Sequence, residues 1–93
     1  MDTRNYAINQ GSRSVAPFPR ENVVVGAKQL RKALNSGRAR QVFLAENADP
    51  AITEPILALC QKHRVAITWV RTMSELGRAC GIEVGAAAAA KVL

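Results

Sequence analysis

Short apolar runs alternate with helical patterns along the chain from Asn22 onward, and this alternation constrains the fold more than any other feature. Three runs have the β-branched or apolar composition of buried strands, namely Val23–Val25, Gln41–Ala45 and Val65–Val70. The segments between them place apolar residues at helical spacing over roughly 7–12 residues. Strands separated by helices of this length predict a mixed sheet of about four strands covered on both faces, a three-layer α/β/α sandwich.

The first and third predicted helices have residues that mark their ends. The first covers Lys28–Ser36. We expect it to end there because the next residue is Gly37, and glycine readily adopts the left-handed conformation that ends a helix. The apolar face of this helix consists of Leu30, Ala33 and Leu34. The third helix opens with Thr72-Met73-Ser74-Glu75, the Ser/Thr-x-x-Glu pattern of a capping box, and runs to about Cys80.

Two other segments leave room for alternatives. Pro55 lies inside the second helical region, which ends near His63, and a proline inside a helix costs roughly 3 kcal/mol. We therefore expect a turn at Ala51–Thr53 and a helix that begins at Pro55. The alanine-rich segment Gly85–Leu93 is predicted as a last strand that leaves space only for small side chains. A helix is its alternative, because alanine favours helices intrinsically.

The composition favours a polyanionic partner. Thirteen Lys and Arg against seven Asp and Glu give a formal net charge of +6, and the isoelectric point is about 10.2. Aromatic residues make up only 4% of the chain, which argues against base stacking on a sheet surface. Cys60 and Cys80 lack metal-ligand spacing, so we expect buried free thiols, with no disulfide and no metal site.

The chain divides once, into a flexible N-terminal arm at residues 1–20 and a domain at residues 21–93. The arm has no apolar periodicity; Arg4, Arg13 and Arg20 either contact nucleic acid or belong to an uninvolved tail. The first twenty residues also lack the apolar core of a signal peptide, and Ala86–Ala90 is too short to span a bilayer. We expect a cytoplasmic protein without a membrane partner.

The sequence contains no recognisable catalytic constellation. The single histidine, His63, lies at a predicted helix end beside Lys62 and Arg64, where a solvated residue is expected. Glu46 and Asp49 could form a carboxylate pair, but Asp49 before Pro50 suits a turn or a helix cap. Phosphate-binding, dinucleotide-binding and nucleophile-elbow motifs are missing. We expect a binding protein with no catalytic residues and no cofactor.

One candidate binding surface lies at the start of the first helix. Lys28, Arg31 and Lys32 point away from the apolar face, which a merely solvated helix would also explain. Before them, Gly26-Ala27 have so little side-chain bulk that the first free backbone N–H groups can approach a phosphate or a base edge. Gln29 both donates and accepts hydrogen bonds, as reading a base edge requires.

A second candidate surface follows the third helix. Gly81 suits a left-handed helix cap, so the chain should turn sharply and expose what comes next. Ile82 and Val84 then flank the carboxylate of Glu83. An aliphatic pair on a tight loop of a basic protein is expected to pack on an unstacked RNA base.

Three segments together resemble the ribosomal L-seven-Ae family, whose members bind kink-turn RNA. They are Gly26-Ala27-Lys28-Gln29 with Lys32, Ala45-Glu46-Asn47-Ala48-Asp49-Pro50, and Leu76-Gly77-Arg78-Ala79-Cys80-Gly81-Ile82-Glu83-Val84. The resemblance covers residues 22–93 and is closest to the small bacterial, ribosome-associated members. It implies a three-layer sandwich that binds RNA with the first helix start and the loop after the third helix.

Carried over residue by residue, the resemblance assigns roles to the two candidate surfaces. Lys28 and Gln29 would contact the guanines of tandem sheared G·A pairs, and Lys32 would reach a guanine oxygen or a phosphate. Ile82 and Val84 would cover the flipped-out nucleotide. Arg31, Glu83, Asp49 and Arg71 complete the expected RNA-binding set with Gly26 and Ala27.

The chain departs from the family at one point, because archaeal and eukaryotic members carry Asn-Glu where Lys28-Gln29 stand here. Losing the glutamate removes a charged acceptor, so we expect a larger salt-dependent share of the affinity. The resulting hypothesis is a monomeric protein that stabilises kink-turn RNA, as a ribosomal or ribosome-associated protein contacting rRNA. The alternatives are a ribosomal protein that binds rRNA by charge and shape alone, and a protein–protein interaction module.

Overall fold

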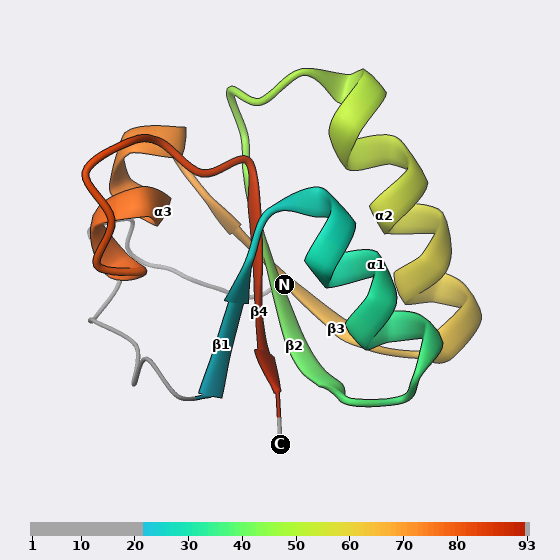
Figure 1. Cartoon of the computed structure of the whole chain (residues 1–93). Helices are drawn as coiled ribbons and strands as arrows, with labels where there is room; N and C mark the ends of the chain where they lie inside the picture. The colour runs from blue at the N-terminus through green and yellow to red at the C-terminus, as the bar shows by residue number, and fades with distance from the viewer. Residues whose placement is uncertain (1–21, 93) are drawn as a thin grey trace.

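The computed structural model describes residues 22–92, so the predicted arm at residues 1–20 lies outside the described residues. Three helices alternate with four strands (Figure 1). In chain order the elements are β1 (Val23–Val25), α1 (Ala27–Asn35), β2 (Ala39–Ala45), α2 (Pro50–His63), β3 (Ala66–Val70), α3 (Met73–Ala79) and β4 (Ala88–Val92).

The strands form one mixed sheet in the order β1-β4-β2-β3. β4 runs antiparallel to both β1 and β2, while β2 and β3 are parallel. The ends of β1, β2 and β3 and the start of β4 therefore share one edge of the sheet, called here the upper edge because it is uppermost in Figure 1. The opposite edge, where β2 and β3 begin and β4 ends, is called the lower edge.

Helices cover both faces of the sheet, which confirms the three-layer sandwich. On one face, α1 and α2 pack through the fully buried Leu30, Leu34 and Ile56 against Val42 and Leu44 of β2. On the other face, a second buried cluster joins α3 to the sheet; its members include Leu76, Phe43, Val70 and Ala89. Figure 1 shows α1 and α2 side by side on one side of the sheet and α3 on the other.

The C-terminal alanines form a strand, so the expected strand is confirmed and the helical alternative is wrong. β4 is the second strand in the sheet order, between β1 and β2. Ala88 and Ala90 belong to the cluster under α1 and α2, and Ala89 belongs to the cluster under α3; all are 0% exposed. Tertiary packing overrides the intrinsic helical preference of alanine, because this position between two layers has room only for methyl groups.

The expected helix start at Pro55 is wrong, because α2 runs without interruption from Pro50 to His63. Asp49 caps it by accepting a hydrogen bond from the Ala51 N–H at 2.9 Å, and Pro50 takes the first helical position. Pro55 forgoes one backbone hydrogen bond, but its neighbours Thr53 and Ile56 on either side are buried. Burial of this continuous stripe outweighs the local cost of the proline.

Of the other elements, β1 has the predicted bounds, and no remaining boundary differs from the predicted one by more than three residues. The largest consequence concerns β2, which begins at Ala39 and so includes Arg40. The two cysteines are free and buried, as predicted. In the described part of the chain, no helix combines the length and apolar character needed to cross a membrane. Residues 22–92 also contain no cluster of three or more side chains suited to holding a metal ion.

Candidate nucleic-acid interface

The N-terminus of α1 lies against the sheet and leaves its first backbone N–H groups without partners in the described part of the chain; it is called here the open start of α1. Gly26 caps the helix with φ +99°, a conformation that side chains rarely adopt, and it contributes no side-chain hydrogen bond. Its N–H donates to the carbonyl oxygen of Ala88 at 3.0 Å, and the helical ladder starts when Leu30 N–H donates to the Gly26 carbonyl at 2.9 Å. Within residues 22–92, no backbone carbonyl accepts from the N–H groups of Ala27, Lys28 or Gln29. These groups therefore form a positive helix end that suits an anion or a base-edge acceptor.

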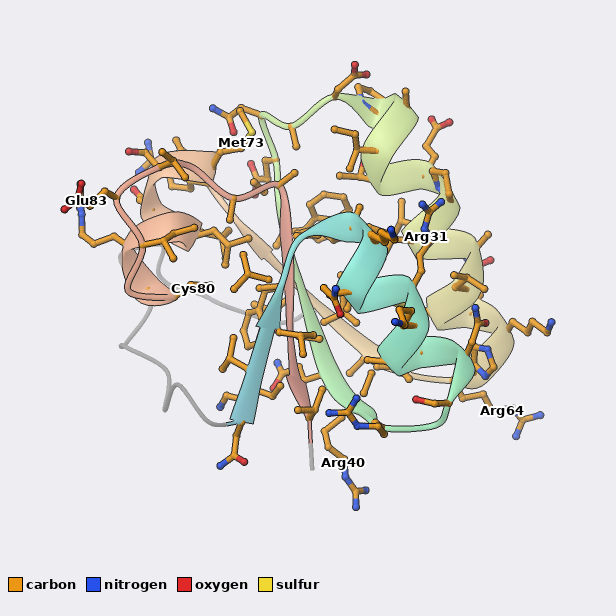
Figure 2. All side chains as sticks on the ribbon, in the orientation of Figure 1. Arg31, Arg40, Arg64, Met73, Cys80 and Glu83 are labelled. Carbon is orange, nitrogen blue, oxygen red and sulfur yellow. The ribbon has the colours of Figure 1, made fainter. Side chains whose placement is uncertain are left out.

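The predicted RNA-facing side chains of α1 are all exposed, but they do not all point the same way. Leu30, Ala33 and Leu34 are buried, whereas Lys28, Gln29, Arg31 and Lys32 are exposed. Positions two apart on a helix diverge by about 160° around the axis, so Gln29 and Arg31 lie on opposite flanks of the exposed face. Figure 2 shows Arg31 on the flank that faces α2. Lys28 and Lys32 form the ridge between these flanks.

The loop after α3 is shaped by two glycines. Gly81 has φ +79°, and its N–H donates to the Arg78 carbonyl at 3.1 Å, while Ile82 N–H donates to the Gly77 carbonyl at 3.1 Å. This pair of bonds is a Schellman motif, as the sequence predicted for the residue after the helix. Gly77 permits the return of the chain, because a Cβ at this position would collide with the carbonyl oxygen of Val84.

The two aliphatic residues of the loop are not equivalent. Ile82 is half-buried and packs against the core cluster under α3, so it anchors the loop as well as bordering its surface. Val84 is 70% exposed, the highest value among the large hydrophobic side chains of the described residues. Glu83 is exposed and points away from the sheet on the far side of α3 from α1 (Figure 2). Val84 is therefore the loop side chain that is free to contact a base.

Asp49 and Arg71 also lie at the upper edge, but at a distance from α1. Asp49 is exposed and caps α2, and Arg71 is exposed directly after β3. Because β3 and β1 are the two outer strands of the sheet, Arg71 is roughly 14 Å across the sheet from the start of α1. A large ligand could contact Arg71 and the start of α1 together, whereas a single nucleotide could not.

Asn47 has a structural role that the sequence reasoning missed. Its Oδ1 accepts a hydrogen bond from the Met73 N–H at 2.8 Å, so a side chain of the β2–α2 turn holds the first turn of α3. Thr72 caps the same helix by accepting from the Glu75 N–H at 3.0 Å, as the capping pattern predicted. An asparagine in a turn after a strand is a common signal, but its partner lies 26 residues away.

The start of α1 and the loop after α3 belong to one continuous edge of the molecule. Ala88, which accepts from Gly26, is the first residue of β4 and directly follows the segment that carries Val84. The Ala86 N–H donates to the Met73 carbonyl at 2.9 Å, so this segment is held to α3 as well. In Figure 1 the first turn of α1 and the end of this segment meet at the upper edge. The two candidate surfaces therefore flank this edge, with α1 on one face of the sheet and the loop after α3 on the other.

The buried thiols contribute no nucleophile to this surface. Desolvation by burial raises the pKa of Cys60 to about 11 and also raises the pKa of Cys80. Both side chains therefore stay protonated at neutral pH, where a reactive cysteine needs a lowered pKa. The upper edge offers the free N–H groups at the start of α1, the exposed cations Lys28 and Lys32, and the exposed aliphatic side chain of Val84.

The fold and this edge define a class of small α/β/α sandwiches that present an open helix end beside an aliphatic loop. The model of the ribosomal protein L7Ae/L30e/S12e/Gadd45 family matches residues 15–92, and the chain belongs to that family.

Relatives of similar size match most of the domain. A protein of Bacillus pumilus (strain SAFR-032) named "RNA-binding protein" is 44% identical over 73 residues, which cover 78% of this chain and 89% of that protein. "RNA-binding protein YbxF" of Geobacillus stearothermophilus is 46% identical over 68 residues, which cover 73% and 83% of the two chains.

Solved structures agree with the fold. The Giardia lamblia 15.5kD RNA binding protein superposes with a TM-score of 0.74 and 28% identity. The superposition covers 78% of this chain and 62% of the Giardia protein. A protein of unknown function from Bacillus halodurans superposes with a TM-score of 0.73 at 22% identity, which supports the fold alone.

Proposed function

We propose that this chain is a non-enzymatic RNA-binding protein that recognises kink-turn RNA with the open start of α1 and the Val84 loop. The observation that supports the proposal is the hydrogen bond from Gly26 to Ala88, which holds the start of α1 against the first residue of β4, four positions after Val84. Two relatives at 44% and 46% identity bear the name RNA-binding protein, and the net charge of +6 suits the same partner. We further propose that the protein acts as a monomer in the cytoplasm, associated with the ribosome through rRNA.

Each part of the surface suits a different feature of a kinked RNA. The free N–H groups at the start of α1 and the side chain of Gln29 match the base edges of sheared G·A pairs. Lys28 and Lys32, exposed on the ridge of α1, match the phosphates on either side. Val84 offers an apolar surface to a nucleotide that has left the stack.

The mechanism is a shift of an RNA equilibrium. A kink-turn exchanges between an open bulge and a sharply bent form, and a protein that binds only the bent form favours it by its differential affinity. The two surfaces flank an edge of the sheet, so a straight duplex would meet α1 or the loop but not both. Neutral Gln29 and cationic Lys28 should make much of the affinity salt-dependent.

The decisive experiment compares two short RNAs at moderate salt. One is a kink-turn hairpin, and the other has its G·A pairs replaced by Watson–Crick pairs. We expect clearly tighter binding to the kink-turn, by about 1–3 kcal/mol for each base-edge contact that the replacement removes. Equal affinities would refute kink-turn recognition and favour rRNA binding by charge and shape. An association with ribosomes that survives RNase would instead indicate a protein partner.

A further inference from the structure

Among the exposed basic side chains near the lower edge, opposite the proposed kink-turn surface, four surround the starts of β2 and β3. They are Arg38, which precedes β2, Arg40 near its start, Lys62 in the last turn of α2, and Arg64 between α2 and β3. The parallel pairing places Gln41 opposite Ala66, so the starts of β2 and β3 carry Arg40 and Arg64 to the same end of the sheet. Figure 2 shows both arginines extending outward, away from the body of the molecule.

The acidic side chains of residues 22–92 all lie toward the other end. Glu46 and Asp49 follow β2 in the turn at the upper edge, and Glu54 is in the second turn of α2. Glu75 is in the first turn of α3, and Glu83 is in the loop before β4. Arg38, Arg40, Lys62 and Arg64 therefore lie away from the acidic side chains of residues 22–92, and their like charges oppose the compact state. The helix dipole explains Lys62, but the three arginines lie outside any helix.

The backbone at two of these arginines is irregular in a way that projects the side chain. Ala39 pairs with Val92 and Gln41 pairs with Lys91, so Arg40 is the extra residue of a bulge in β2. Arg64 has φ +57°, a left-handed conformation at the end of α2 where glycine would be more favourable by roughly 1 kcal/mol. The left-handed arginine at position 64 is unfavourable for the fold alone, and the bulge at Arg40 turns a second cation toward the same end of the sheet, an arrangement that suits binding of an anion.

We propose that Arg38, Arg40, Lys62 and Arg64 form a second RNA surface that binds the phosphate backbone of a duplex. The guanidinium fork suits phosphate oxygens, and the deep, narrow major groove of an RNA duplex keeps side chains from its base edges, so we expect binding without base readout. β2 spans roughly 23 Å between the two edges, so one molecule can hold a kink-turn at the upper edge and a second RNA helix at the lower edge. This inference rests on the proposed RNA-binding function.

The test separates the two surfaces with two RNAs and three variants. Arg40→Ser with Arg64→Gly removes two charges, and the glycine also relieves the left-handed backbone, so this double variant should fold. Arg78→Glu on the exposed face of α3 changes the net charge by the same amount and serves as the control. Val84→Asp impairs the upper edge only. Each protein is titrated with a kink-turn hairpin and with a short blunt duplex that has no G·A pairs.

The double variant should bind the duplex roughly ten-fold more weakly at low salt, with the slope of log affinity against log salt reduced by about 2. Its kink-turn affinity should change far less, and Val84→Asp should give the reverse pattern. Duplex binding that falls equally in the Arg78→Glu control, or not at all in the double variant, would overturn the proposal and leave an acidic protein as the candidate partner. If the wild-type protein binds the kink-turn hairpin no more tightly than the duplex, the proposed function is contradicted, whatever the double variant does.

Discussion

The carbonyl oxygen of Val84 lies so close over Gly77 that a Cβ on Gly77 would collide with it. This contact sets the path of the loop that carries the exposed Val84 side chain. The smallest residue in α3 is therefore what allows the proposed base-binding surface to form.

Gly77→Ala should displace the loop. The added methyl group must push against backbone atoms rather than a flexible side chain, so overpacking of about 1–3 kcal/mol should outweigh the better helix propensity of alanine. Chemical denaturation would measure the loss, with Ser74→Ala on the exposed side of the same helix as a control. Stability equal to that of wild type, together with unchanged RNA affinity, would show that the Val84 carbonyl does not restrict this position.

Val84→Asp should weaken kink-turn binding without harming the fold. Val84 is 70% exposed, so the fold loses little packing, whereas a carboxylate would face a displaced base and the nearby phosphates. We expect at least a ten-fold loss of affinity for the hairpin, corresponding to about 1.4 kcal/mol or more. Ala58→Asp, at an exposed position of α2, introduces the same charge elsewhere. Ile82→Asp is a poorer probe, because Ile82 also packs in the core cluster under α3.

Gln29→Ala should distinguish base readout from general attraction. Gln29 is exposed at the open end of α1, and its amide can pair with a base edge. The variant should lose about 1–3 kcal/mol on the kink-turn and much less on a plain duplex. Asn35→Ala, at the far end of the same helix, should leave both affinities unchanged. Equal losses on both RNAs would refute specific readout by Gln29.

The free energy of unfolding should fall as the pH rises above 9, because the Cys60 thiol then ionises in the unfolded chain but not in the folded one. Burial raises the pKa of this thiol from its ordinary 9.0 to about 11. Above pH 9 the unfolded chain releases the thiol proton while the folded chain retains it, so unfolding becomes easier until about pH 11. The loss over this window should reach about 2–3 kcal/mol. Denaturation at several pH values would show a shallower decline for Cys60→Ala; parallel declines would exclude Cys60 as the cause.

Most of the fold was predictable because its determinants are local. The strand composition of Val23–Val25, the capping threonine at Thr72 and the glycine stops at Gly37 and Gly81 all act within a few residues, and each is found in the structure. The candidate site residues at the start of α1 were also identifiable, because helix amphipathicity alone separates Lys28 from Leu30.

The predictions that failed, or that needed the structure, depend on partners distant in sequence. Pro55 lies inside α2 because Thr53 and Ile56 are buried against other elements, and no local rule contains that burial. The same holds for Asn47, whose hydrogen bond reaches Met73.

The sequence by itself determined the alternation of elements, the exposed faces of the helices and the basic character, because these follow from side-chain periodicity and composition. Only the tertiary structure decided that Gly26 meets Ala88 at one edge, that Val84 rather than Ile82 is free, and that the arginines of the lower edge are separated from the acids. These relations arise from how antiparallel and parallel strands bring remote segments together, which no pattern within a single segment encodes.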